Sequence, residues 1–299
     1  MAKKIIIRIL KIFGYTIAAA VVIPLLAVGI SLLVCSFCIK TTGYTVELEG
    51  IDSPARIVVV ADLHGKEYGS QNSRLLHKVR AQEPDAIVLL GDILPSAPSE
   101  SDMDSLLHLT ADLQDIAPVY FAMGNHELSY SKTYGDSWIS SLRETGAVVF
   151  DETWADIALN GNTVRMGGTM GHGYYFGRSK AAFEASPEYQ VLSALEDSPY
   201  PAILLAHMPE TVTLSFGKSY WHIDLVLSGH THGGVIRVPF KGGLYAPMEG
   251  WWPTYDYGDM MLNDRMRIII SSGLSGHDHI PRLFNLPEIV AIDLVAPQT

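Results

Sequence analysis

The residues best suited to chemistry in this chain stand where five apolar stretches end. Each stretch runs from aliphatic residues into Asp, Asn or His, and the stretches cover residues 57–64, 86–92, 119–127, 202–210 and 224–234. Because open α/β sheets build ligand sites at the carboxyl ends of their strands, we expect these polar side chains to meet. Their oxygen and imidazole atoms suit a pair of divalent cations. The candidate residues are Asp62, His64, Asp92, Asn125, His126, His207, His230 and His232.

Each ending taken alone also has an ordinary structural explanation. Gly91-Asp92 is typical of a turn after a strand, and a single histidine such as His64 or His207 is more often hydrogen-bonded than metal-bound. His230-Thr231-His232 is a stronger metal signal, because two imidazoles follow one strand. The combination favours a metal centre, since chance would have to place a suitable residue after five successive strands.

The elements that must position these residues alternate between strands and helices, which is typical of an α/β fold. Asn160-Gly161 predicts a hairpin turn, so a partly antiparallel region begins there. Apolar residues at helical spacing mark the expected helices, and aliphatic runs mark further strands. The helices are expected around residues 75–79, 106–116, 137–144 and 180–195, and the further strands around residues 267–271 and 289–294.

Length and charge limit the classes of function. A chain of 299 residues suits one large domain with an appendage. Five of its 21 basic residues and none of its 32 acidic residues lie in residues 1–40, so the remainder carries 16 bases against 32 acids. Such a surface repels nucleic acid, which we therefore do not expect as a partner. A local cationic metal site would still attract phosphate.

The amino-terminal segment predicts a membrane anchor. Residues 12–39 contain no charged side chain and exceed the roughly 20 helical residues that cross a bilayer core. The alternative is a cleaved signal peptide with a weak site at Val34-Cys35-Ser36, but the apolar region of such peptides spans only about 7 to 15 residues. Basic residues precede the span, so positive-inside logic puts residues 1–11 in the cytoplasm. The domain would then lie outside the cytoplasmic membrane.

The rest of the chain is expected to form one domain. After the anchor we expect a short polar connection at residues 40–43, within a linker and first strand over residues 40–54. The domain follows at residues 55–299. Both cysteines, Cys35 and Cys38, lie in the expected anchor, so cysteine usage does not indicate the compartment of the domain.

The order of the five polar blocks resembles that of the calcineurin-like metallophosphoesterases. The blocks are Asp-x-His at 62–64, Gly-Asp at 91–92, Gly-Asn-His-Glu at 124–127, His207 and Gly-His-x-His at 229–232. The similarity covers about residues 55–295 and implies a four-layer αββα sandwich with two facing mixed sheets. The tail at residues 273–294 also resembles a membrane-anchored bacterial subgroup, although Pro281-Arg282 departs from the Pro-x-Arg spacing of that subgroup.

The resemblance implies two metal sites that share one carboxylate. Asp92 would bridge the metals, because among these residue types only a carboxylate offers lone pairs to both. It would be joined by Asp62, His64 and His232 in the first site, and by Asn125, His207 and His230 in the second. The two divalent ions would be manganese, iron or zinc, a choice that ligand types alone do not make.

The same resemblance implies a hydrolytic mechanism. A hydroxide that bridges the metals would attack phosphorus in line. His126 would protonate the leaving group or stabilise the transition state, and is not expected to bind metal. In an extended segment His230 and His232 would share one face, and a turn at Gly233-Gly234 would let the backbone approach closely.

Two further segments have open interpretations. Gly276 to His279 repeat the Gly-His-x-His form outside the family's ligand order, so we interpret them as a loop. His172 is a candidate for the rim of the site. The aromatic segment at residues 235–262 predicts a lip for substrate or for the membrane interface, although aromatic rings also fill ordinary cores.

Three functions are consistent with the sequence. The first is a membrane-anchored phosphomonoesterase or phosphodiesterase that acts outside the cytoplasm on a lipid-linked or cell-envelope phosphate. The second is a pyrophosphatase of nucleotide-linked lipids, of the UDP-diacylglucosamine type, at the cytoplasmic face. The third is a non-catalytic metal-binding interaction module, against which the intact ligand set argues. The sequence does not indicate the oligomeric state.

Overall fold

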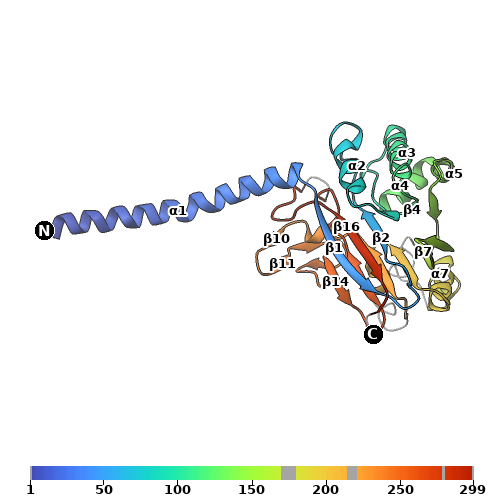
Figure 1. Cartoon of the computed structure of the whole chain (residues 1–299). Helices are drawn as coiled ribbons and strands as arrows, with labels where there is room; N and C mark the ends of the chain where they lie inside the picture. The colour runs from blue at the N-terminus through green and yellow to red at the C-terminus, as the bar shows by residue number, and fades with distance from the viewer. Residues whose placement is uncertain (1, 170–179, 214–220, 278–279, 298–299) are drawn as a thin grey trace.

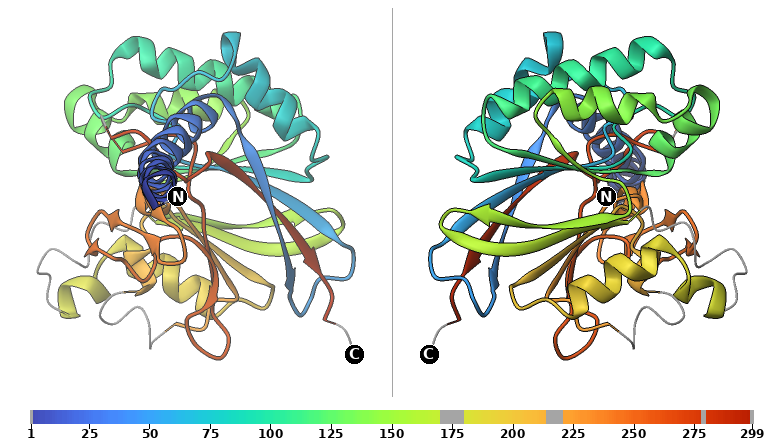
Figure 2. Two further views of the ribbon diagram at one scale, coloured as in Figure 1. Left: turned by 90° about the vertical axis from the view of Figure 1, so that its left-hand side faces the viewer. Right: turned by 90° about the vertical axis from the view of Figure 1, so that its right-hand side faces the viewer.

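Two six-stranded sheets face each other, and helices cover the outer face of each sheet (Figure 2). The computed structural model describes residues 2–169, 180–213, 221–277 and 280–297. A long helix, α1 (Ala2–Phe37), projects away from these layers (Figure 1). The layers form the expected four-layer αββα arrangement with two mixed sheets, so the predicted fold class is confirmed.

The first sheet contains the strands that end in the first three polar blocks. Its strand order is β1-β16-β2-β3-β4-β5, with β16 parallel to β1 and antiparallel to β2. The strands are β1 (Lys40–Glu47), β2 (Ala55–Val60), β3 (Ala86–Leu90), β4 (Val119–Ala122), β5 (Val148–Phe150) and β16 (Glu288–Val295). Its outer face is covered by α2 (Ser73–Arg80), α3 (Glu100–Gln114), α4 (Asn125–Tyr134) and α5 (Ser137–Glu144), with the short helix η1 (Ser70–Asn72) before α2.

The second sheet contains the strands that end in the last two polar blocks. Its order is β14-β15-β9-β8-β7-β6. The strands are β6 (Thr153–Leu159), β7 (Asn162–Thr169), β8 (Ala202–Ala206), β9 (Leu225–Ser228), β14 (Gly258–Met261) and β15 (Arg267–Ile270). The helices on its side are α6 (Lys180–Glu184), α7 (Pro187–Glu196) and α8 (Glu210–Thr213). After β9 come η2 (His232–Gly234) and two short strand pairs, β10 (Arg237–Val238) with β11 (Gly242–Gly243), and β12 (Tyr245–Ala246) with β13 (Gly250–Trp251).

Strand β2 shows why the apolar runs end where they do. Ile57 and Val59 pack between the two sheets, whereas Val58 and Val60 pack beneath the helices. Because successive side chains point to opposite faces, a strand that is covered on both faces must be apolar throughout. The first polar residue after such a run therefore marks the end of the strand, where the layers open.

Several expected elements are confirmed and two are wrong. Residues 137–144 form α5, and β6 and β7 form an antiparallel hairpin across Asn160-Gly161. The polar connection expected at residues 40–43 is instead the first half of β1, because β16 pairs with these residues. The helix expected over residues 180–195 is two helices, because Ser186 caps α7 and Pro187 begins it. Helix α4 is not among the expected elements.

Helix α1 has the length and composition to cross a membrane. Most of its apolar side chains are exposed, but its last turns contact the domain. Cys35 is buried, and the hydroxyl oxygen of Ser31 accepts a hydrogen bond from the backbone N–H of Phe284 at 2.7 Å. The guanidinium of Arg74 donates to the carbonyl oxygen of Phe37. The helix therefore meets the domain beside the loop that precedes β16.

Candidate metal centre

All eight candidate residues lie around one pocket at the carboxyl ends of the strands. Two follow β2, one follows β3, two begin α4, one follows β8 and two follow β9. Asp62 and His207 have no exposed surface and lie at the buried side of the site. The pocket has a volume of about 210 Å³, and its lining residues are His64, Asp92, Ser96, Asn125, His126, His230, His232, Pro247 and His277.

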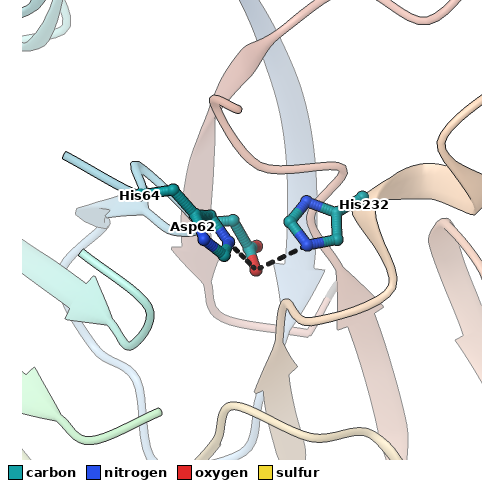
Figure 3. A group of neighbouring side chains, drawn as sticks. All are labelled: Asp62, His64 and His232. Atoms are coloured by element: carbon teal, nitrogen blue, oxygen red, sulfur yellow. Dashed lines mark ion pairs between the residues drawn. The ribbon is translucent and has the colours of Figure 1, made fainter. Parts of the chain in front are cut away.

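One group of ligand atoms forms around Asp62. Nε2 of His64 and Nε2 of His232 each lie 4.0 Å from Oδ1 of Asp62, and both rings point toward that oxygen (Figure 3). The three side chains place ligand atoms within 4.8 Å of one another. Such a spacing suits one cation between them, because ligand atoms lie about 2.0–2.2 Å from a metal. These are three of the four residues that the resemblance implies for the first metal.

A second group forms around Asp92. Nε2 of His207 lies 3.2 Å from Oδ2 of Asp92, and His230 completes a group within the same 4.8 Å limit. The same Oδ2 lies 3.9 Å from Nε2 of His64 and 3.7 Å from Nε2 of His126. Asp92 is therefore shared between neighbouring groups, as a bridging carboxylate must be.

Several ligand atoms are buried without a hydrogen-bond partner in the part of the chain that the structure describes. They are Nε2 of His64, Nε2 of His230 and Oδ1 of Asn125. Each buried polar atom without a hydrogen-bond partner lowers the stability of the fold by about 1–3 kcal/mol. A cluster of such atoms therefore indicates a site where a bound species contacts them. Divalent cations fit these atoms, because each offers a lone pair and none offers an obligatory proton.

Backbone carbonyls fix the opposite ring nitrogen of three histidines. The contacts are 2.7 Å from Nδ1 of His207 to Leu90, 3.0 Å from Nδ1 of His126 to Leu94, and 3.2 Å from Nδ1 of His232 to Ser275. Such a contact holds the proton on Nδ1 and leaves Nε2 free to face the pocket. Metal-bound histidines are typically oriented in this way.

The implied metal ligands share an unusual backbone conformation. Five of the seven have left-handed φ angles: 51° at Asp62 and His64, 52° at Asp92, 66° at His230 and 51° at His232. Each costs about 1–3 kcal/mol, and such strain gathers at functional sites. The prediction of an extended segment at His230 and His232 is therefore wrong, because the chain turns at both residues and η2 begins at His232.

Two glycines permit close contacts at the site. A Cβ atom on Gly234 would come within 2.3 Å of Cα of Gly243, so the close backbone approach expected at Gly233-Gly234 is confirmed. A Cβ atom on Gly124 would come within 2.2 Å of Oδ1 of Asp92. The glycine of the Gly-Asn-His-Glu block therefore leaves room for the shared carboxylate.

Burial and neighbouring charge set the protonation of the pocket. Burial lowers the pKa of His64 to about 4 and the pKa of His230 to about 3, so both imidazoles are neutral near pH 7. Burial acts against the charged form of His207 too, but the carboxylates of Asp92 and Asp62 raise its pKa to about 10. Burial raises the pKa of Asp62 to about 7. Burial also acts to raise the pKa of Asp92, but His207 and the other nearby histidines hold the pKa of this carboxyl below its usual range.

Glu127 joins the loops that carry Asp92 and Asn125. Its carboxylate is fully buried and accepts four backbone hydrogen bonds. The donors are the N–H groups of Asp92 at 2.8 Å, Ile93 at 2.9 Å, Leu94 at 3.0 Å and Gly124 at 2.8 Å. In the sequence, Glu127 stands out only as the last residue of the Gly-Asn-His-Glu block. Its place three residues after Gly124, at the start of a helix, is the signal that predicts a capping carboxylate.

Arg282 organises the loop beside the Asp62 group. Its buried guanidinium donates to the carbonyl oxygens of Ser272 and Ser275, both at 2.6 Å, and to the backbone and side-chain oxygens of Asn285 at 2.8 and 3.0 Å. Asn285 in turn donates from Nδ2 to the carbonyl oxygen of His232 at 2.7 Å. The role of Arg282 cannot be seen in the sequence, where only the spacing of Pro281-Arg282 stands out, because the acceptors of Arg282 become its neighbours only in the folded chain.

Two further histidines, His277 and His126, lie at the metal pocket. His277 lies in a loop, as expected, but it also lines the metal pocket, with its ring centroid 5.5 Å from that of His232. His126 packs edge-on against His64 at 4.4 Å between centroids and joins His64 and Asp92 in a third group of ligand atoms. His172 and His279 lie outside the described residues.

Comparison with protein families gives a match to the model described as calcineurin-like phosphoesterase, over residues 55–234. A metallophosphoesterase of Campylobacter jejuni, called uncharacterized, is 27% identical over 83% of this chain and 61% of its own length. The phosphodiesterase YaeI of Escherichia coli is 27% identical over 81% of this chain and 83% of its own. A bovine transmembrane protein with a metallophosphoesterase domain is 28% identical over 65% of this chain and 46% of its own.

The chain spans 61% of the Campylobacter relative and 62% of each of two Helicobacter pylori relatives. Among solved structures, a purple acid phosphatase from yellow lupin seeds matches with a TM-score of 0.47 and 14% identity. That match covers 77% of this chain and 46% of the lupin chain.

Proposed function

The chain belongs to the calcineurin-like phosphoesterase family, and from that premise we propose that it is a membrane-anchored phosphoesterase that uses two divalent metal ions. One observation carries the proposal: Oδ2 of Asp92 lies 3.9 Å from Nε2 of His64, which belongs to the Asp62 group, and 3.2 Å from Nε2 of His207, which belongs to the second group. The first metal would take Asp62, His64, Asp92 and His232. The second would take Asp92, Asn125, His207 and His230.

The residues of the site would have separate roles in hydrolysis. Two such cations, when bound, activate water and stabilise charge on the attacking and leaving oxygens. Oδ1 of Asp62 accepts a hydrogen bond from the backbone N–H of His230 at 3.0 Å, and Oδ1 of Asp92 accepts one from the backbone N–H of His126 at 2.9 Å. These hydrogen bonds fix the direction of both carboxylates. The neutral amide of Asn125 adds an oxygen without adding negative charge, so the site stays attractive to phosphate.

His126 is the proposed proton donor. It lines the pocket, its side chain is 13% exposed, and Leu94 holds its Nδ1. Nε2 therefore faces the pocket, where the doubly protonated ring would give its Nε2 proton to the leaving oxygen of the ester and keep the Nδ1 proton hydrogen-bonded to Leu94.

We propose that the substrate is a phosphate carried by a lipid or by the cell envelope. The support is α1, which is long and apolar enough to hold the pocket close to a bilayer. The basic residues that precede the apolar run favour a cytoplasmic amino terminus and an extracytoplasmic domain. A pyrophosphatase of nucleotide-linked lipids at the cytoplasmic face is the second candidate, since the same metal groups would serve it.

Metal analysis and an ester screen on the full chain in detergent test the activity. We expect two metals per chain and manganese-stimulated hydrolysis of p-nitrophenyl phosphate or bis(p-nitrophenyl) phosphate. Asp92→Asn should abolish turnover, because it weakens the one ligand that both metals share. Asp264→Asn, at an exposed carboxylate, serves as the matched control. Bound metal without any hydrolysis by the unaltered chain would favour the non-catalytic metal-binding module, and unchanged turnover in Asp92→Asn would refute the bridging role of Asp92.

Reporter fusions at the carboxyl terminus test the orientation. A phosphatase reporter that is active only outside the cytoplasm should be active when fused to this chain. An inactive reporter, together with an active cytoplasmic one, would favour the pyrophosphatase at the cytoplasmic face.

A further inference from the structure

The β10–β11 hairpin lies near the domain end of α1 (Figure 1). Its loop, the loops that follow it and the loop before β16 carry large exposed apolar side chains. Phe240 is fully exposed, and two adjacent tryptophans follow it along the chain. Exposed apolar patches of this kind mark surfaces that meet a partner or a membrane. We call the set the apolar rim, and its members are Phe240, Met248, Trp251, Trp252, Ile280 and Phe284.

Backbone contacts hold the segments that carry the rim next to one another. Ile236 forms a bridge with Leu283, and the N–H of Arg237 donates to the carbonyl oxygen of Leu283 at 3.0 Å. The N–H of Trp252 donates to the carbonyl oxygen of Leu244 at 2.9 Å. The aromatic segment after η2 is therefore held against the loop that carries Phe284.

The rim contacts the anchor itself. The N–H of Phe284 donates to the hydroxyl of Ser31, which lies well inside α1, and Ser31 and Leu32 are partly buried. The uncharged run begins at Ile12, and about 20 helical residues cross the hydrocarbon core. A span that starts at Ile12 would therefore end near Ser31. Phe284 would then lie at the level of the lipid headgroups, where aromatic side chains are favoured.

The walls of the metal pocket continue into the rim. Pro247 lines the pocket and precedes Met248, which is exposed in the rim. His277 also lines the pocket, and its carbonyl oxygen accepts from the N–H of Ile280 at 2.9 Å. Lys241 adds a cation at 4.7 Å from the ring of Trp252, which suits anionic headgroups.

We infer that the apolar rim rests on the headgroup layer of the bilayer that α1 spans, so that the metal pocket opens at the membrane surface. This inference rests on the proposed function for the anchor and for the pocket. It adds that the phosphate reaches the pocket from a lipid in the same leaflet.

Photo-crosslinking of the full chain in nanodiscs tests the contact. Benzoylphenylalanine replaces Phe240 or Phe284 in discs of phosphatidylcholine and phosphatidylglycerol, and mass spectrometry identifies the adducts. Tyr200 is the matched control, because it is exposed and precedes β8, at the opposite end of the sheet from the pocket. We expect lipid adducts at positions 240 and 284 and at least tenfold fewer at position 200.

Other adduct patterns overturn the inference. Equal yields of lipid adducts at all three positions, or no lipid adduct at 240 and 284, would show that the rim does not contact the membrane. Adducts to a second copy of the chain, in discs that hold two copies, would show that the rim is a dimer interface instead. Hydrolysis of p-nitrophenyl phosphate or bis(p-nitrophenyl) phosphate by the same samples is a separate readout. If hydrolysis is absent while lipid adducts form, the proposed function fails and the membrane contact stands.

Discussion

Arg282 and His232 are linked through a single oxygen atom. The carbonyl oxygen of Ser275 accepts from Nη1 of Arg282 at 2.6 Å and lies 3.2 Å from Nδ1 of His232. The buried guanidinium therefore holds the acceptor that orients an implied ligand of the first metal. No carboxylate forms an ion pair with Arg282 among the described residues, so its charge is directed at backbone oxygens.

Arg282→Lys should release the first metal while leaving the second in place. A single ammonium cannot reach acceptors on both sides of the loop as the guanidinium fork does. Loss of an outer contact of this kind typically costs 10- to 100-fold in metal affinity. Elemental analysis should find close to one metal per chain. The matched control is Arg265→Lys, whose guanidinium is half exposed and paired with Asp224. Two tightly held metals in Arg282→Lys would contradict the positioning role.

His126→Ala should keep both metals and lose most turnover. A positioned proton donor contributes roughly 10²- to 10⁴-fold to rate, and we expect a loss in that range. The loss should be smaller for esters with good leaving groups, which need no proton. Metal content and turnover are measured on the same sample, with His222→Ala as an exposed-histidine control. Metal loss in His126→Ala would show instead that His126 is a ligand.

Glu127→Gln should destabilise the fold around Asp92. Each carboxylate oxygen of Glu127 accepts two backbone N–H groups, and an amide nitrogen in place of one oxygen would face two donors. Two buried N–H groups without acceptors cost about 1–3 kcal/mol each. Chemical denaturation should therefore find a lower free energy of unfolding, by at least about 2 kcal/mol. Glu144→Gln, at an exposed helical site, should change it little; equal effects would refute the capping role.

Metal affinity should rise with pH. In the metal-free protein the pKa of His207 is about 10 and that of Asp62 about 7, so near pH 7.5 His207 is protonated and Asp62 is largely ionised. A metal must displace the proton of His207, because only the neutral imidazole binds it. Affinity at the second site should rise about tenfold per pH unit between pH 7.5 and 9. Calorimetry in buffers of different ionisation enthalpy should count about one released proton. No released proton would show that His207 is already neutral.

The ligand candidates can be predicted from the sequence because they follow a local rule. A strand that is covered on both faces is apolar until it ends, so Asp62 or Asp92 stands out as the first polar residue. The family resemblance adds the order of the blocks. Neither requires knowledge of which loops lie side by side.

The supports of the site cannot be predicted in this way. Arg282 binds Ser272 and Ser275 because β16 inserts between β1 and β2 and carries its preceding loop to the pocket. The turn at His230 and His232 likewise depends on contacts with Asp62 and with the loop at Gly243. Such contacts join residues far apart in the chain, and the positive φ angles that they impose are uncommon for any residue other than glycine.

The position of β16 has a consequence for biosynthesis. The strand follows every other strand of both sheets along the chain, yet it lies between β1 and β2, so the first sheet is incomplete until residues 288–295 have been synthesised. Until then β1, which follows α1 almost directly, exposes the edge that β16 later covers. In a chain held at a bilayer by the proposed anchor, that edge can pair with other strands before β16 is made.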